Sequence, residues 1–429
     1  MMARASRRRV VVTGIGMITP LGPDTEETFE NCAHGRSGIE RLTAFDPRGL
    51  PCDIGGRVRD EWLGKEALRG ARRLHGSRSL RLLMAAARQG ADRSELAKIP
   101  SRDRVGVAVG SFGDPPAIED VAFLHRFYDP AHGWDLDSLK LWGGYNPVQF
   151  FRRKPDTLAT ALAAALRCEG PSLATVSSCA AGAQAIGEAF RIVQAGGADV
   201  MVAGGSEAIL TFTCFLGFVL LKALAERYES PATASRPFDR KRNGFVLSEG
   251  AGIVVLEERE HARRRGALPL GEILGYGSTS DAYRITDTHP RGEAAAAAMR
   301  AALDDARLPP EAVHCINAHG TSTVKNDAAE SLAIETVFGS LTERIPVTSN
   351  KSMLGHAIAA SGAIEFILAL EGMRRSVLLP TINHDHPDPK CGLRIVANQA
   401  LCLPHRVALS NSFGFGGHNA CLCLRGGDG

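Results

Sequence analysis

Short apolar segments rich in β-branched residues alternate with amphipathic helical patterns along almost the whole chain. Helical patterns occupy residues 180–195, 292–306 and 355–373. Strand patterns lie between them, at residues 10–13, 105–109, 173–176, 200–203, 252–256, 270–275, 313–318, 345–348, 406–410 and 420–424. Strands of this apolar kind, separated by helices, are typical of sheets covered on both faces. The alternation therefore predicts an α/β layered fold with buried, largely parallel strands.

The chain also contains a weak internal repeat. Each half opens with an apolar strand that enters a Gly-containing loop, in VVVTGIGMIT and in LGEILGYGSTS. Each half closes on a Gly-rich, hairpin-like pair, in GFVLSEGAGIVVLEE and in RVALSNSFGFGGHNACLCL. The polar stretch EREHARRRGALP joins them, so we expect two similar α/β halves, residues 1–262 and 263–429, without a flexible linker.

Composition excludes several classes of protein. The chain has 50 Lys and Arg against 47 Asp and Glu, which is too balanced to predict a nucleic-acid-binding face. No apolar stretch reaches the ~18 residues of a transmembrane helix, so no membrane partner is expected. Ten scattered cysteines, in a chain long enough to bury a large core, favour a reducing compartment and hence the cytoplasm. The basic segment MMARASRRR precedes a strand rather than a signal-peptide apolar region, and we interpret it as a solvated tail.

One cysteine stands at a sharp strand-to-helix turn, in LATVSSCAAGAQAIGEAF. Residues 173–176 read as a strand, 177–179 as the turn, and the helix that follows presents one apolar face, formed by Ala183, Ile186, Phe190 and Val193. The N-terminus of this helix is expected to stabilise a thiolate and to lower the pKa of Cys179. A cysteine at such a turn can equally be a small buried apolar residue.

Two histidines occur at comparable strand ends. His319 follows a strand in VHCINAHGTST, and Lys351 and His356 follow another in IPVTSNKSMLGHAIAASG. A single histidine at a strand end is more often structural than catalytic. Ligand sites of α/β sheets form at the carboxyl ends of strands, so Cys179, His319 and His356 together predict a nucleophilic site.

These segments resemble one family. The sequence is similar to the β-ketoacyl-acyl-carrier-protein synthases of the KAS I/II type, including the ketosynthases of type II polyketide systems. The resemblance extends over nearly the whole chain, in VVVTGIGMITPLG, GPSLATVSSCAAGAQAIGEAFRIVQAGGADVMVAGGSEA, SRPFDRKRNGFVLSEGAGIVVLEE, NAHGTSTVKNDAAE, TSNKSMLGHAIAASGA and LSNSFGFGGHN. It implies a thiolase-like fold, in which two similar halves form a five-layer α-β-α-β-α sandwich.

The resemblance also implies a role for each matching residue. Cys179 is the acyl-accepting nucleophile, and its amide forms the oxyanion hole together with that of Phe415. His319 and His356 face the thioester of the extender unit, and Lys351 matches the catalytic lysine near the second histidine. The remaining matches are Glu330 as the acidic partner of Lys351, Thr321 and Thr323 as hydroxyls that bind the phosphopantetheine arm, and Phe413 and Phe415 as the phenylalanines of a Gly-rich gating loop.

The implied reaction is a decarboxylative Claisen condensation between an acyl group on Cys179 and a malonyl group on acyl carrier protein. It needs neither metal nor cofactor. Gly14 and Gly16 follow the first strand, but Thr19 replaces the third glycine of a dinucleotide fingerprint. The alternatives are a silent, chain-length-factor-like subunit, which typically lacks the cysteine, and a non-decarboxylating Cys acyltransferase. The sequence leaves open the chain length, the starter and the choice between fatty acid and polyketide.

Some segments depart from the family or carry other motifs. Residues 112–154 match poorly and predict a surface excursion with short helices near the acyl pocket and dimer edge, and His418 stands where many relatives have Thr. The apolar run 209–224 predicts an interface, in a homodimer or a ketosynthase heterodimer, with core packing as the alternative. The further expectations are surface positions for His384, Asp385 and His386, core packing for Cys421 and Cys423, a solvated turn at Arg240, Lys241 and Arg242, and carrier contacts or solvated surface for Arg72, Arg73, Arg152 and Arg153.

Overall fold

The computed structural model describes residues 7–63, 77–114, 118–142 and 154–427. Within these ranges ten strands form one ladder, in the order β12-β11-β15-β16-β10-β1-β9-β8-β4-β7. The N-terminal set is β1 (Val10–Ile18), β4 (Val105–Gly110), β7 (Ser172–Thr175), β8 (Val200–Glu207) and β9 (Gly250–Glu258). The C-terminal set is β10 (Gly271–Ser280), β11 (Cys315–Asn317), β12 (Val347–Thr348), β15 (Val407–Gly414) and β16 (His418–Gly426). Read outward from the central β1–β10 pair, the two sets follow the same chain order, which supports the internal repeat.

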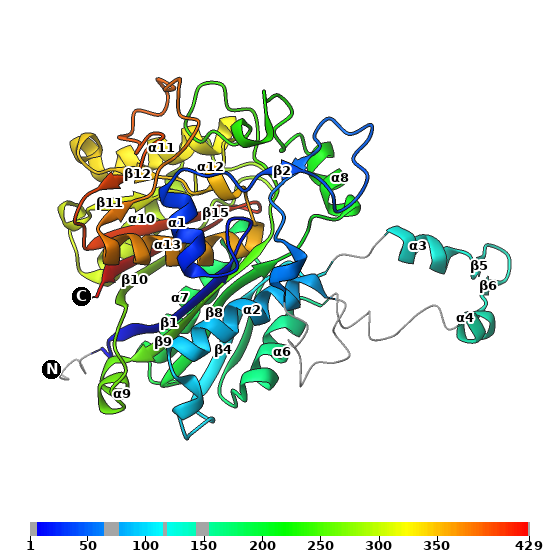
Figure 1. Ribbon diagram of the computed structural model, residues 1–429, viewed down its shortest axis with the longest axis horizontal. Coiled ribbons are helices and arrows are strands. Elements are labelled where there is room, and N and C mark those ends of the chain that lie inside the picture. Colours follow the sequence, from blue (N-terminus) through cyan, green and yellow to red (C-terminus); the bar gives the residue numbers. More distant parts are fainter. Residues whose placement is uncertain (1–6, 64–76, 115–117, 143–153, 428–429) are drawn as a thin grey trace.

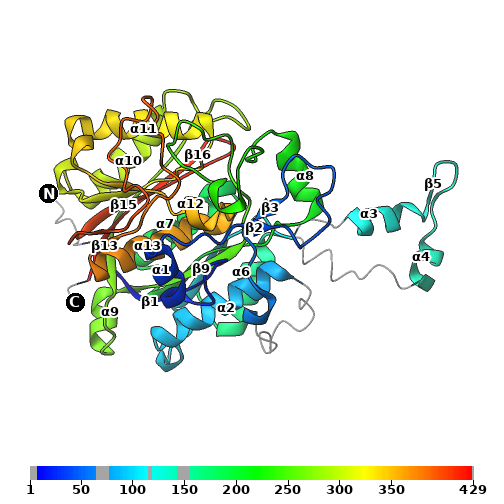
Figure 2. The same ribbon diagram turned by 45° about the horizontal axis from the view of Figure 1, so that its top comes forward.

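Helices cover and separate these strands, as Figures 1 and 2 show. α2 (Arg78–Arg93) and α6 (Asp156–Leu166) lie outside the N-terminal strands, and α10 (Glu293–Ala306) and α11 (Val324–Phe338) lie on the opposite outer side. α7 (Ala181–Gln194) and α13 (Ser361–Arg375) lie between the layers and contact strands of both sets. The predicted five-layer α/β sandwich is confirmed. The other helices are α1 (Thr25–Ala33), α3 (Ile118–His125), α4 (Leu136–Trp142), α8 (Phe212–Leu220), α9 (Arg259–Arg264) and α12 (Lys351–Leu354).

The prediction of largely parallel strands is wrong. β4 pairs in parallel with β7 and β8, and β11 with β12 and β15. The pairs β1–β9, β1–β10, β8–β9, β10–β16 and β15–β16 are antiparallel. Alternation with helices predicts parallel crossovers only, and it does not report antiparallel pairing between strands distant in the chain, such as β1 with β9 and β10. The hairpin-like pair predicted at the end of the chain is confirmed, because β16 returns antiparallel to β15.

The first strand also continues through glycines that the sequence suggested as a loop. β1 runs to Ile18 with a register shift between Val12 and Gly14. A Cβ on Gly14 would lie 2.2 Å from the carbonyl oxygen of Gly90, and one on Gly16 would lie 2.2 Å from that of Ala86. These glycines therefore permit α2 to pack directly on the backbone of β1.

α7 and α13 approach each other closely at their first turns. A Cβ on Gly182 would lie 2.5 Å from the carbonyl oxygen of Ala359, and one on Gly362 would lie 2.9 Å from the Cβ of Ala183. Only glycine allows this backbone separation at both positions. The predicted helix at 355–373 begins at Ser361 instead, because α12 and a 3₁₀ turn at Ile358–Ala360 precede it.

The excursion after β4 is described in part. α3 and α4 flank a two-stranded hairpin, β5 (Tyr128–Asp129) and β6 (Gly133–Trp134), and Figures 1 and 2 show this group extending away from the layers. Short helices were predicted here. The two smaller pairs of strands are β2 (Glu40–Arg41) with β3 (Ile54–Gly55), and β13 (Val377–Leu378) with β14 (Leu401–Cys402). Among the described helices, none combines the length and the apolar character that a membrane crossing requires.

Candidate active site

Cys179 lies in the turn that joins β7 to α7. Residues Ser178–Ala180 form one 3₁₀ turn, and Ser178 takes a φ of +50°, a strained value for a residue with a Cβ. Such strain persists where the surrounding structure fixes the chain, and it clusters at functional sites. The thiol is buried, at 5% exposure, against the first turn of α7.

His356 directly contacts the thiol. Its Nε2 lies 3.0 Å from the Sγ of Cys179, and its Nδ1 lies 2.9 Å from the hydroxyl oxygen of Ser361. That oxygen also accepts the amide hydrogen of Ala357, at 3.0 Å. The Ser361 hydroxyl can still either donate to Nδ1 or accept from it, so His356 can present Nε2 as a proton acceptor or as a donor.

His319 is held in one tautomer by Lys351. The Nζ of Lys351 donates to the carbonyl oxygen of His319 at 2.7 Å and lies 3.4 Å from its Nδ1. An ammonium has hydrogens only to donate, so Nδ1 acts as the acceptor and Nε2 carries the ring hydrogen. The rings of His319 and His356 meet edge to face, with centroids 5.3 Å apart.

The acidic partner of Lys351 is Glu365, not Glu330 as the sequence led us to expect. Lys351 and Glu365 form an ion pair in which both side chains are buried. Glu330 instead accepts the backbone amides of His319 and Gly320, each at 2.8 Å. It therefore holds the backbone beneath the histidine ring.

Burial dominates the electrostatics of the site. It raises the pKa of Cys179 to about 11, against the lowering effects of Lys351 and of the amides of Phe415 and Cys179. The lowered pKa expected from the helix N-terminus is thus wrong for the resting thiol. Burial, aided by the charge of Lys351, holds the pKa values of His319 and His356 well below the usual range. The carboxyl groups of Glu330 and Glu365, also buried, have pKa values raised to about 7.

The donor set has the composition of a metal site, with one sulfur and two imidazole nitrogens within 4.8 Å of one another. Its surroundings oppose a cation. The Lys351 ammonium lies 3.4 Å from His319, and thiolate, the form that ligates metals, is disfavoured by burial. We interpret the set as a nucleophile with two hydrogen-bonding partners.

A cavity of about 250 Å³ opens onto these three groups. The predicted pantetheine and gating residues line it: Thr321, Thr323, Phe413 and Phe415. Thr321 and Thr323 share a hydroxyl–hydroxyl hydrogen bond of 3.0 Å. Phe413 packs edge to face on His319, with centroids 6.0 Å apart, and the amides of Phe415 and Cys179 point at Sγ. The structure therefore brings every predicted site residue to this cavity except Lys351 and Glu330, which lie behind it.

Sequence reasoning missed Glu365, Ser361 and Phe245. Phe245 packs edge to face on His356, with centroids 5.2 Å apart. A lone acid in the apolar segment SGAIEFILAL was a usable signal for Glu365, because a buried carboxylate needs a partner. Neither Ser361 nor Phe245 carries such a signal.

Other sequence expectations have mixed outcomes. Cys421 and Cys423 are buried in the core, as predicted, and all ten cysteines are free thiols. Arg242 contradicts the predicted solvated turn, because it is buried among carboxylates and carbonyl oxygens. In the run 209–224, Phe215 is buried whereas Leu220 and Leu221 are exposed. The pairs Arg72–Arg73 and Arg152–Arg153 lie outside the described residues.

Comparisons with known proteins agree with this geometry. Models of the N-terminal and C-terminal domains of β-ketoacyl synthases match residues 7–262 and 270–385. The chain is 40% identical to 3-oxoacyl-[acyl-carrier-protein] synthase 2 of Synechocystis sp., over 99% of each chain. It is 39% identical to the protein of the same name from Staphylococcus aureus, over 98% of this chain and 99% of that protein.

Solved structures agree as well. The ishigamide ketosynthase/chain length factor superposes with a TM-score of 0.86 at 34% identity, covering 99% of this chain and 100% of that one. A type II polyketide ketosynthase solved with its acyl-carrier protein gives a TM-score of 0.84 at 34% identity, over 98% and 100%. With the domain models matching most of its length, and with Cys179 beside His319 and His356, this chain belongs to the β-ketoacyl synthase family.

Proposed function

We propose that this chain joins an acyl group held on Cys179 to a malonyl group carried by acyl carrier protein, with loss of carbon dioxide and extension by two carbons. The contact between Cys179 Sγ and His356 Nε2, with His319 beside it, carries the proposal. The relatives are named 3-oxoacyl-[acyl-carrier-protein] synthase 2, and one structural neighbour was solved with its acyl-carrier protein. Both support acyl carrier protein as the partner of this chain.

The first step is acyl transfer. The thiol gives its proton to His356 Nε2 while Sγ attacks the carrier thioester, and the proton then passes to the departing carrier thiol. Oxygen charge in the tetrahedral intermediate is stabilised by the amides of Cys179 and Phe415. Such a donor is worth ~10²–10³ in rate. The raised pKa of Cys179 makes proton acceptance by His356 necessary, because little free thiolate exists at neutral pH.

The second step is decarboxylation followed by condensation. The malonyl thioester loses carbon dioxide, and the electron pair of the broken C–C bond moves toward the thioester carbonyl to form an enolate. The enolate oxygen accepts hydrogen bonds from the Nε2 groups of His319 and His356. Lys351 keeps His319 in the donor tautomer. The enolate carbon then attacks the acyl carbonyl on Cys179, and the C–S bond breaks to release the thiolate, which takes up a proton from water by way of His356 and returns to the resting thiol. Thr321 and Thr323 bind the phosphopantetheine arm, and Phe413 and Phe415 gate the acyl pocket.

The alternatives are separable by a single experiment. We expect purified protein to release carbon dioxide from malonyl-carrier protein and to take one acyl adduct on Cys179. A silent chain-length-factor-like subunit would do neither, and a non-decarboxylating acyltransferase would take the adduct alone. Cys179 argues against the silent subunit, and the pair of His319 and His356 beside it favours the condensing enzyme over the acyltransferase. Whether the product is a fatty acid or a polyketide is decided by product analysis.

We also propose the organisation of the active protein. Residues 1–262 and 263–429 form the two halves, supported by the mirrored strand order. The chain dimerises, either with itself or with a chain-length-factor-like paralogue, and the exposed Leu220 and Leu221 at the end of α8 lie in that interface. A structural neighbour titled ketosynthase/chain length factor supports the second form. The free cysteines support a cytoplasmic location. Light scattering on the purified chain tests dimerisation. Co-purification with a paralogue that lacks the cysteine and is encoded by a neighbouring gene decides between a homodimer and a heterodimer.

A further inference from the structure

The segment 235–245 connects both sides of the candidate active site. The Ser235 hydroxyl donates to the carbonyl oxygen of Lys351 at 2.7 Å, and the ring of Phe245 packs on His356. Between these points, the amide of Gly244 donates to the carbonyl oxygen of Ser322 at 3.0 Å. The segment thus touches the histidine side of the cavity and also the loop that carries Thr321 and Thr323.

Arg242 makes the densest set of these contacts. Its side chain is 2% exposed, and its Nε and Nη2 donate to the carbonyl oxygens of Thr323 and Val324, at 3.0 and 3.2 Å. Its Nη1 donates to the Asp239 carbonyl at 2.9 Å and to the Asp388 carboxylate at 2.6 Å. The flat guanidinium suits this arrangement, because it offers several donors in a fixed fork.

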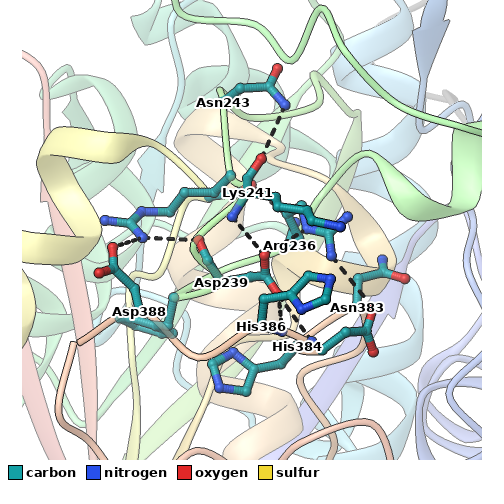
Figure 3. A network of polar contacts seen from close by, with 12 residues as sticks. Arg236, Asp239, Lys241, Asn243, Asn383, His384, His386 and Asp388 are labelled. Atoms are coloured by element: carbon teal, nitrogen blue, oxygen red, sulfur yellow. Dashed lines mark hydrogen bonds and ion pairs between the residues drawn. The ribbon is translucent and has the colours of Figure 1, made fainter. Parts of the chain in front are cut away.

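The surrounding network holds Arg242 in place. Asp239 is fully buried, and its carboxylate accepts the amides of Lys241, Asp385 and His386 at 2.7 to 2.9 Å (Figure 3). Figure 3 also shows Asp388 beside this cluster, on the loop that contains His384 and His386. The turn at 239–242 and the loop at 384–388 are therefore locked together behind Arg242.

The loop at 321–324, which Arg242 binds, contains a strained residue. Ser322, between Thr321 and Thr323, takes a φ of +68°, and its amide donates to Asp327 at 3.1 Å. Thr323 caps α11 by accepting the amide of Asn326 at 3.3 Å. A non-glycine residue keeps a positive φ only where neighbouring contacts over-determine it. The Arg242 bonds lie on the C-terminal side of this strained turn and fix where the Thr323 hydroxyl faces the cavity.

We propose that Arg242 is a positioning residue for the Thr321–Thr323 hydroxyl pair, and through it for the pantetheine arm of the substrate. The inference rests on the proposed function, which assigns that arm to the pair. Arg242 lies outside the cavity and acts through the carbonyl oxygens of Thr323 and Val324, and through Asp327, whose carboxylate lies 3.7 Å from Nε and accepts the Ser322 amide.

The test compares Arg242→Met with a matched variant of the same network, Arg236→Met. The guanidinium of Arg236 binds Asp239 and Asp385, neither of which lines the cavity. The first assay is decarboxylation of malonyl-pantetheine. We expect Arg242→Met to raise KM about tenfold and to change kcat less than threefold, while Arg236→Met leaves KM within twofold.

A second assay needs no decarboxylation. Free pantetheine should protect Cys179 from iodoacetamide, as read by intact mass. The half-protecting concentration should rise about tenfold in Arg242→Met, with the unprotected alkylation rate within twofold of wild type. If wild-type protein shows protection but no decarboxylation, the proposed function fails while the positioning role of Arg242 is still measured.

Three results would overturn the inference: an unchanged KM and protection constant in folded Arg242→Met, an equal rise in Arg236→Met, or a fall in alkylation rate and kcat at constant KM. If Arg242→Met does not fold, Arg242→Lys and Asp388→Asn take its place. Arg242→Lys keeps the positive charge but loses the planar guanidinium. Asp388→Asn keeps the guanidinium but removes the carboxylate that Nη1 binds. We expect each to raise KM about threefold, and an unchanged KM in both rejects the role.

Discussion

Two crossovers occupy equivalent places in the strand order but differ in chemistry. β7 and β12 are the outermost strands of the ladder, and each leads into one of the two central helices, α7 and α13. The first crossover holds Cys179 among serines, alanines and glycine. The second holds Lys351, His356 and Ser361, and its helix contributes Glu365.

The nucleophile and the buried charged groups of the site thus lie on different crossovers. Small uncharged residues around Cys179 leave space for an acyl group and keep the thiol neutral, as its raised pKa shows. The second crossover contains the buried Lys351–Glu365 ion pair and one of the two imidazoles, that of His356, while His319 follows β11. One repeated architecture therefore supplies two dissimilar surfaces, which meet where the helices cross.

The largest effect on activity should come from removing the nucleophile. Cys179→Ala should abolish condensation, because no second thiol lines the cavity among the described residues, and should leave the fold intact, because alanine fits a turn already rich in alanine. Intact mass after incubation with acyl-carrier protein should show one adduct on the wild type and none on the variant. An adduct that persists in Cys179→Ala would refute the assignment.

The next largest effect should come from the histidines. His319→Ala should retain acylation of Cys179 and lose malonyl decarboxylation by about 10²–10³-fold, since one oxygen donor is removed. His356→Ala should lose decarboxylation and also slow acylation, because the ring of His356 lies within hydrogen-bonding distance of Sγ. Separate assays of adduct formation and carbon dioxide release distinguish the two. Wild-type decarboxylation in either variant contradicts the donor role.

The ion pair of the second crossover provides a test by stability. Lys351→Met leaves Glu365 buried without its partner, which should cost about 3–5 kcal/mol of the free energy of unfolding. Adding Glu365→Leu should recover a large part of that loss, because no unpaired charge remains. Urea denaturation of the wild type, both single variants and the double variant measures the coupling. Additive losses would show that the pair does not act as a unit.

The smallest effect concerns Glu330 and pH. Its pKa rises from 4.5 in the unfolded chain to about 7 in the folded one, so between these values the folded state holds a proton that the unfolded state lacks. Its contribution to stability is therefore present below pH 4.5 and is lost as the pH rises to about 7. Relative to Glu330→Gln, the wild type should lose about 2 kcal/mol of unfolding free energy between pH 5 and pH 7. A constant difference across this range would show that Glu330 does not titrate there.

The sequence predicted the layers and the convergence of Cys179, His319 and His356, because both leave local patterns. Cys179, His319 and His356 each follow a short apolar segment, and their meeting at one sheet edge follows from topology. The Gly-rich segment predicted the β15–β16 hairpin, but the sequence did not predict the antiparallel pairing of β1 with β9 and β10, because these strands lie far apart in the chain.

Partner choice was lost as well. Glu330 and Glu365 both stand in helices near the site, and spacing alone does not say which one faces Lys351. The structure decides this by orientation: the α13 acid points at the ammonium, and the α11 acid points at backbone amides. Arg242 was misread for a similar reason, because a run of three basic residues gives no sign that the third one turns inward.

The crossing of α7 and α13 has a consequence for how this protein can diversify. Gly182 and Gly362 place the two helices backbone to backbone, which brings together the turns just before them and so sets how closely Cys179 and His356 approach each other. Loops at the cavity mouth can then change without altering that approach. The residues that contact the substrate can therefore vary while the distance between the thiol and the imidazole stays fixed. A methyl group added at Gly182 or Gly362 would push the two helices apart and change that distance.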